Sequence, residues 1–191
     1  MIRKPAILIV ALLLTLLVGC LISEHDEIRL TINKDGKSGV LEFTRTNIQS
    51  DESTPEKQKR DFDELISNWQ SDSYLIEKMS EGYYVKDRSL RLEKGVLVWK
   101  QQLLFGDIRK ILDSDIARDT LRFRLEHSDI IASTNGTVRR YADSTVVLWP
   151  ITPGTFQLKL KRSQFTPTSD FVGMFKKYLL TKKKPSEKTK R

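Results

Sequence analysis

The residues in this chain that could carry out chemistry are one cysteine, two histidines and two clusters of carboxylates. His127 is followed directly by Ser128 and Asp129. A Ser-His-Asp relay needs groups that converge from separate elements, whereas adjacent strand residues point to opposite faces. We therefore expect His127 to be an exposed turn residue. A typical zinc site needs three or four nitrogen or sulfur ligands, which this composition does not provide, so the sequence predicts no metal and no cofactor.

The carboxylates lie at Asp61-Asp63-Glu64 and at Asp113-Asp115-Asp119. A catalytic pair usually consists of two carboxyls roughly 5–10 Å apart across a cleft. The first cluster is expected on the polar side of a helix. The second surrounds a short helix at 107–112, where aspartate commonly caps helix ends. The sequence therefore predicts a protein that is not an enzyme.

The N-terminus has the order of an export signal. Arg3 and Lys4 precede an apolar run from Ala6 to Leu14, which continues almost unbroken to Gly19 and Cys20. A charged start, an apolar stretch of roughly 7–15 residues and a small residue at its end are typical of secretory signals. The alternative is an uncleaved anchor, because the run from Ala6 to Ile22 has 17 residues, the lower limit for a spanning helix.

The segment Leu17-Val18-Gly19-Cys20 resembles the lipobox of bacterial lipoproteins. The resemblance implies that the Cys20 sulfur receives a diacylglycerol, that the chain is cut between Gly19 and Cys20, and that the new amino group is acylated too, for example with palmitate. Residues 1–19 are then the signal peptide and residues 20–27 a lipidated tether. It also implies a cell-envelope location. Leu21, rather than an aspartate, after the cysteine favours the outer membrane, facing the periplasm, if the organism is Gram-negative.

The positive charge is concentrated at the C-terminus. The chain has a formal charge of +8, and its last sixteen residues contain eight Lys or Arg and one acid. Those basic residues are candidates for contact with an anionic surface: Lys176, Lys177, Lys182, Lys183, Lys184, Lys188, Lys190 and Arg191. The partner would be anionic lipid, a cell-wall polymer or an envelope protein. The alternative is a solvated, disordered tail at 182–191.

Nucleic acid is not an expected partner, because without its tail and signal the chain is nearly neutral. Basic side chains do lie at expected outward positions of strands and turns: Arg122, Arg124, Arg139, Arg140, Lys159, Lys161 and Arg162. We interpret them as a solvated sheet face that discourages edge pairing.

Residues 28–181 have the pattern of one α+β domain, a largely antiparallel sheet with two or three helices packed on one face. Alternating segments predict hairpins around 33–36 and 93–95, and Asn135-Gly136 predicts a third tight turn. Ser53-Thr54-Pro55-Glu56 predicts a helix start with a capping-box glutamate, and a last helix is expected from about residue 168.

Together these features predict a membrane-tethered envelope lipoprotein that acts as a non-catalytic binding or assembly module. A carrier of a lipid or other apolar ligand is the alternative, and would need an apolar cavity inside the sheet. A carboxylate-dependent hydrolase is a further alternative, and would need acid pairs with raised pKa values that converge in a cleft.

Overall fold

The computed structural model describes residues 21–111, 116–117, 119–125 and 129–182. Its strands are β1 (Leu21–Ile32), β2 (Gly39–Ser50), β3 (Tyr83–Glu93), β4 (Val96–Phe105), β5 (Ile116–Ala117), β6 (Thr120–Leu125), β7 (Asp129–Thr134), β8 (Thr137–Arg140), β9 (Thr145–Pro150) and β10 (Gly154–Arg162). Its helices are α2 (Pro55–Gln70), α3 (Asp72–Ser80), α4 (Ile108–Ile111) and α5 (Phe171–Lys182). All the pairings are antiparallel, so the predicted α+β class is confirmed.

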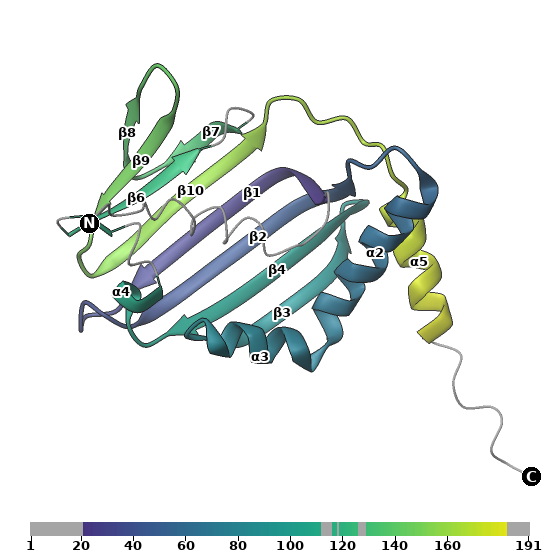
Figure 1. Ribbon diagram of the computed structural model, residues 1–191, viewed down its shortest axis with the longest axis horizontal. Coiled ribbons are helices and arrows are strands. Elements are labelled where there is room, and N and C mark those ends of the chain that lie inside the picture. The colour runs from purple at the N-terminus through teal and green to yellow at the C-terminus, as the bar shows by residue number, and fades with distance from the viewer. Residues whose placement is uncertain (1–20, 112–115, 118, 126–128, 183–191) are drawn as a thin grey trace, which may run out of the picture.

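A six-stranded sheet, with the order β3-β4-β2-β1-β10-β7, forms the centre of the molecule (Figure 1). The predicted hairpins β1–β2 and β3–β4 are both present. In the first turn, Asp35 accepts hydrogen bonds from the backbone N–H groups of Lys37 and Ser38 at 2.8 and 2.9 Å. Gly36 in this turn has a φ of 69°, a conformation that glycine adopts at little cost.

The sequence did not predict a second, four-stranded sheet with the order β5-β6-β9-β8. It packs on one end of the large sheet's inner face, where Leu30, Leu41 and Leu103 join Val147 and Trp149 in one apolar cluster. Side chains two residues apart share a face of a strand, so Trp99 and Leu97 lie on the same face as Leu103. The inner face is therefore covered by the small sheet at one end and by helices at the other (Figure 1).

Asn135-Gly136 does not form the predicted tight hairpin. β7 pairs with β10 in the large sheet, whereas β8 pairs with β9 in the small one, so the chain changes sheets at Asn135. The Asn135 amide fixes this crossing. Its Nδ2 donates to the carbonyl of Thr155 at 2.7 Å, and its Oδ1 accepts from Trp149 Nε1 at 3.0 Å. The hydrogen bonds of the Asn135 side chain to Thr155 and Trp149 therefore take the place of the β7–β8 backbone hydrogen bonds that a hairpin would have made.

The helices follow the expected apolar spacing. In α2, Phe62 and Leu65 are buried and Trp69 packs beside them, and in α5 the buried residues are Phe171 and Phe175. The cap differs from the prediction. Thr54 is the N-cap and accepts from the Lys57 backbone N–H, so Glu56 does not occupy the capping-box position.

Candidate functional site

The expected tether at 20–27 is wrong from residue 21 onward. β1 begins at Leu21, and its register with β2 runs from Leu21 opposite Ser50 to Ile32 opposite Gly39. Leu21 is buried in the cluster that contains Phe171 and Phe175. Pairing with β2 makes this segment a strand, although its buried side chains include the polar Ser23 and Asp26 beside Leu21. Gly19 and Cys20 lie outside the described residues.

The helix α5 presents three of the predicted basic residues. Lys176 and Lys177 are exposed, and Lys182 is also exposed, with its Nζ 5.7 Å from the centre of the Tyr178 ring. Leu180 lies among them and is 64% exposed. The remaining candidates, Lys183, Lys184, Lys188, Lys190 and Arg191, lie outside the described residues.

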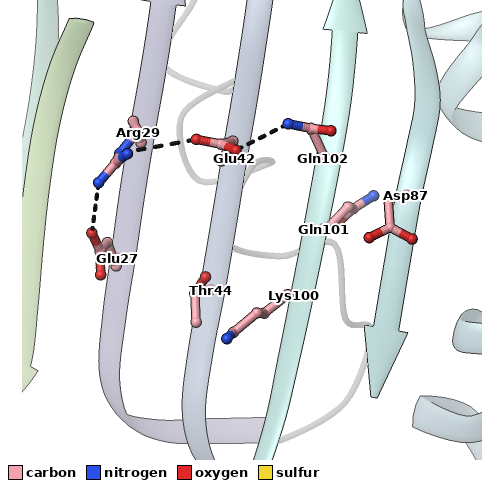
Figure 2. Close-up of a pocket in the computed structure, with 8 residues that line it drawn as sticks. All are labelled: Glu27, Arg29, Glu42, Thr44, Asp87, Lys100, Gln101 and Gln102. Atoms are coloured by element: carbon pink, nitrogen blue, oxygen red, sulfur yellow. Dashed lines mark hydrogen bonds and ion pairs between the residues drawn. The ribbon is translucent and has the colours of Figure 1, made fainter. Parts of the chain in front are cut away.

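A shallow groove of about 310 Å³ lies on the outer face of the large sheet (Figure 2). Most of its lining side chains point outward from β1, β2 and β4, because they alternate with the core residues of those strands. Asp87 of β3 and Gln101, whose buried side chain binds Tyr74 on the inner side, complete the lining. The residues that line it are Glu27, Arg29, Glu42, Thr44, Asp87, Lys100, Gln101 and Gln102. The groove is therefore polar and contains charges of both signs.

Ion pairs and a hydrogen bond link side chains within β1 and between the neighbouring strands β1, β2 and β4 in this groove. Arg29 lies 3.7 Å from Glu27 and 3.9 Å from Glu42, and Glu42 also accepts a hydrogen bond from Gln102 at 3.0 Å (Figure 2). At its edge Lys100 pairs with Glu93 at 2.9 Å. Lys100, with help from Arg91, lowers the pKa of Glu93 by hydrogen bonding. These pairs fix the positions of charged groups on an open surface.

The carboxylates of the groove are solvent-exposed and ion-paired. A carboxyl acting as general acid at neutral pH usually needs an apolar pocket that keeps it protonated. Glu27 and Glu42 are 34% and 42% exposed, and Arg29 lies between them. The groove can offer paired donors and acceptors to a ligand that carries both charges.

One of the carboxylates was placed wrongly by the sequence. Asp61 is not on the polar side of α2, since it is only 1% exposed and accepts a 2.5 Å hydrogen bond from the Ser50 hydroxyl. Asp63 is exposed and pairs with Lys59, as expected for the polar side. Burial raises the pKa of Glu64, and the nearby charge of Asp61 raises it further. Asp61 thus joins α2 to the end of β2.

The second carboxylate cluster is only partly described. Asp107, which is not one of the three, precedes α4 and accepts from the Arg109 backbone N–H at 3.0 Å, so it caps the start of this helix. Asp119 pairs with Arg109. Asp113, Asp115 and His127 lie outside the described residues.

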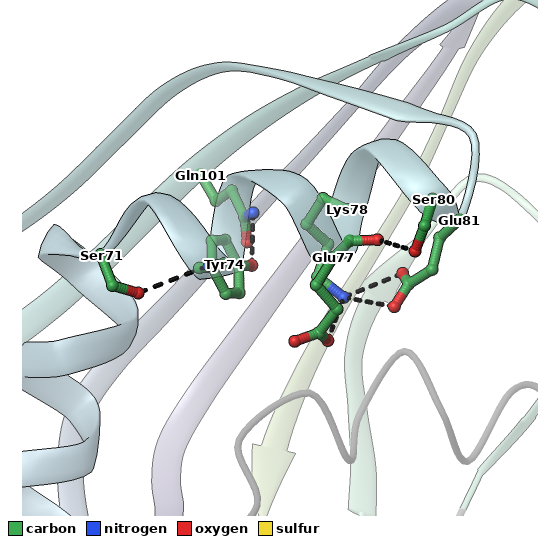
Figure 3. A network of polar contacts seen from close by, with 7 residues as sticks. All are labelled: Ser71, Tyr74, Glu77, Lys78, Ser80, Glu81 and Gln101. Carbon is green, nitrogen blue, oxygen red and sulfur yellow. Dashed lines mark hydrogen bonds and ion pairs between the residues drawn. The ribbon is translucent and has the colours of Figure 1, made fainter.

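A polar network that the sequence did not predict joins α3 to β4 (Figure 3). Gln101 Nε2 donates to the Tyr74 hydroxyl at 2.6 Å, and burial raises the pKa of Tyr74 to about 12. Lys78 is fully buried, and its Nζ donates to both carboxylate oxygens of Glu81 at 2.9 and 2.8 Å. The cation also lies 5.5 Å from the Tyr74 ring centre. These contacts hold the side chains of Tyr74 and Lys78 in place beneath α3.

The predicted basic strand residues do not form one face. Arg122, Arg124, Arg139 and Arg140 belong to the small sheet, whereas Lys159, Lys161 and Arg162 belong to β10 of the large sheet. Among the described residues no group of His, Cys, Asp and Glu could hold a metal ion. His25 lies on β1, beside Glu24 at 3.4 Å.

No protein-family model, no curated protein and no solved structure matches the chain. In the part of the chain that the structure describes, none of the helices has the length and apolar character needed to cross a membrane.

Proposed function

We propose that this chain is a bacterial envelope lipoprotein, lipidated at Cys20, whose single domain acts as a non-catalytic binding or assembly module. The observation that carries the proposal is the start of β1 at Leu21. With Leu21 and Ile22 in a paired strand, an uncleaved anchor would have to span the membrane with the 15 residues from Ala6 to Cys20. A spanning helix needs about 17–25 residues, so this supports the lipobox interpretation over the anchor.

The binding surface in this proposal is the outer face of the large sheet. Its groove offers Arg29 and Lys100 beside Glu27 and Glu42, a pattern that suits a peptide or cell-wall segment carrying charges of both signs. The inner face supports a module over a carrier, because apolar side chains from the small sheet and the helices pack onto it. An enzyme is less well supported, since the groove carboxylates are exposed and ion-paired.

Intact-mass measurement of the membrane-extracted protein, beside Cys20→Ala, tests the lipoprotein proposal. We expect the wild type to lack residues 1–19 and to carry acyl mass that the variant does not. A wild-type mass that retains Met1 to Gly19 without lipid would refute the proposal.

The binding surface is tested by photo-crosslinking in cells that carry the chain. A photoreactive residue at Thr44, inside the groove, should give a specific adduct. The same residue at Lys94, which is exposed in the β3–β4 turn, serves as the matched control and should give none. Equal labelling at the two positions, or none at Thr44, would argue against a partner in the groove.

A further inference from the structure

Helix α5 has an outward face that is partly apolar. Its buried residues, Phe171 and Phe175, are separated by one turn, and Leu180 lies on the opposite side. Leu180 is four residues from Lys176 and three from Lys177, so the three side chains are neighbours on the helix surface. Leu180 and Leu179 are 64% and 37% exposed. An exposed leucine between lysines offers an apolar contact and positive charge to an anionic membrane surface.

The charge on this face has one sign. From Phe171 to Lys182 the helix contains three lysines and no acidic residue. Asp170 precedes it, and its carboxylate accepts from the Gly173 backbone N–H at 2.8 Å, so that charge is placed at the helix start. The lysine stems can lie along an apolar surface while their ammonium groups reach lipid phosphates.

The start of α5 lies beside the start of β1. Ser50 is opposite Leu21 in the β1–β2 ladder, and the Ser50 backbone N–H donates to Ser169 Oγ at 3.0 Å, two residues before the helix. Figure 1 shows α5 along the edge of the molecule at the end where β1 begins. Lipid on Cys20 would hold this end directly at the membrane, because only one peptide bond separates Cys20 from Leu21.

We infer that the outward face of α5, formed by Lys176, Lys177, Leu179 and Leu180, docks on the anionic headgroup surface of the same membrane that holds the lipidated Cys20. This inference rests on the proposed lipidation. It assigns the basic residues to the anchoring membrane and not to a distant polymer or protein. Docking at two points, the lipid and the helix, fixes the orientation of the domain, which a single flexible lipid tether would not do.

The test uses lipidated Leu180→Cys protein, labelled with an environment-sensitive thiol-reactive fluorophore and reconstituted in vesicles. Cys20 is the only other cysteine, and its sulfur is occupied by lipid in the proposed form. Tyr84→Cys is the matched control, because Tyr84 is 61% exposed, close to the 64% of Leu180, and lies on β3. The vesicles contain phosphatidylcholine alone or mixed with phosphatidylglycerol.

We expect blue-shifted, brighter emission from position 180 in the phosphatidylglycerol vesicles, reversed by high salt, and unshifted emission from position 84. Lys176→Gln and Lys177→Gln should each lower the ratio of docked to undocked protein about fivefold, as expected for about 1 kcal/mol per basic residue. Lys34→Gln, at an exposed turn position, should leave the ratio unchanged.

Aqueous emission from position 180 in both vesicle types, or equal shifts with and without phosphatidylglycerol, would overturn the inference. The intact mass of the same sample separates the two proposals. If the acyl mass is present and position 180 remains aqueous, only the docking inference fails. If the acyl mass is absent, the lipoprotein proposal fails and the docking inference fails with it.

Discussion

The hydrogen bond between Ser50 and Asp61 is expected to make a large contribution to the stability of this domain. Ser50 is fully buried and Asp61 is 1% exposed, with 2.5 Å between the hydroxyl and the carboxylate. Hydrogen bonds to charged groups contribute about 1.5–3 kcal/mol, and a buried acceptor left without its donor costs a similar amount. We expect Ser50→Ala to lower the free energy of unfolding by about 2–3 kcal/mol.

A double-mutant cycle separates this interaction from general effects of the substitution. Asp61→Ala should also destabilise the fold, but the Ser50→Ala/Asp61→Ala variant should cost less than the sum of the two, with a coupling of at least about 1 kcal/mol. Ser53→Ala is the matched control, because Ser53 is exposed next to the same helix, and we expect a change within about 0.5 kcal/mol.

Urea unfolding of the detergent-solubilised protein, followed by tryptophan fluorescence, measures these differences. Trp69 lies on α2, with its ring 5.9 Å from that of Phe175, and reports loss of the helical layer. If Ser50→Ala matched the Ser53→Ala control, or if the two single changes were additive, the assigned role of the hydrogen bond would be wrong.

Three further changes test other parts of the fold. Burial raises the pKa of Tyr74 to about 12 in the folded protein, whereas the unfolded chain ionises near the ordinary tyrosine pKa of 10. The wild type should therefore lose about 2 kcal/mol of stability between pH 10 and pH 12. Urea titrations at alkaline pH measure this loss, which Tyr74→Phe should not show. Gly136→Ala should lower the melting temperature at a cost of about 1–3 kcal/mol, because a Cβ there would lie 2.5 Å from Trp149 Nε1, and an unchanged midpoint would contradict this close packing. Asn135→Ala should cost about 1–3 kcal/mol and shift the emission of Trp149, which loses its hydrogen-bond acceptor; unaltered emission would show that Asn135 does not hold the two sheets together.

Local pattern was sufficient to predict most elements. The alternation in 83–92 and 96–104 predicted β3 and β4, and the spacing of Phe62, Leu65 and Trp69 predicted the buried stripe of α2. Such periods report which side of an element is buried, and they depend only on neighbouring residues. The polar groove could have been found in part by the same rule, since Arg29 and Glu42 occupy outward positions of their strands.

The errors arose where a residue's environment depends on distant parts of the chain. Asp61 was assigned to the exposed side of α2 because the residue pattern of that helix contains no information on its contact with Ser50 of β2. Asn135-Gly136 matched a hairpin, but β8 pairs with β9 instead of β7, and no local pattern distinguishes these partners. Leu21 to Glu27 was assigned to a tether because polar and charged residues predominate in it, and only its pairing with β2 and β10 makes it a strand.

The sequence by itself determined most of the element types, the antiparallel α+β class and the lipobox hypothesis, because each depends on a short stretch of neighbouring residues. Only the tertiary structure decided that two sheets share the inner face, that Asp61 is buried, and that α5 begins beside the start of β1. These features depend on which distant segments pair and pack. That choice is made by the burial of apolar area and the satisfaction of polar groups over the whole domain, so no single segment of the chain encodes it.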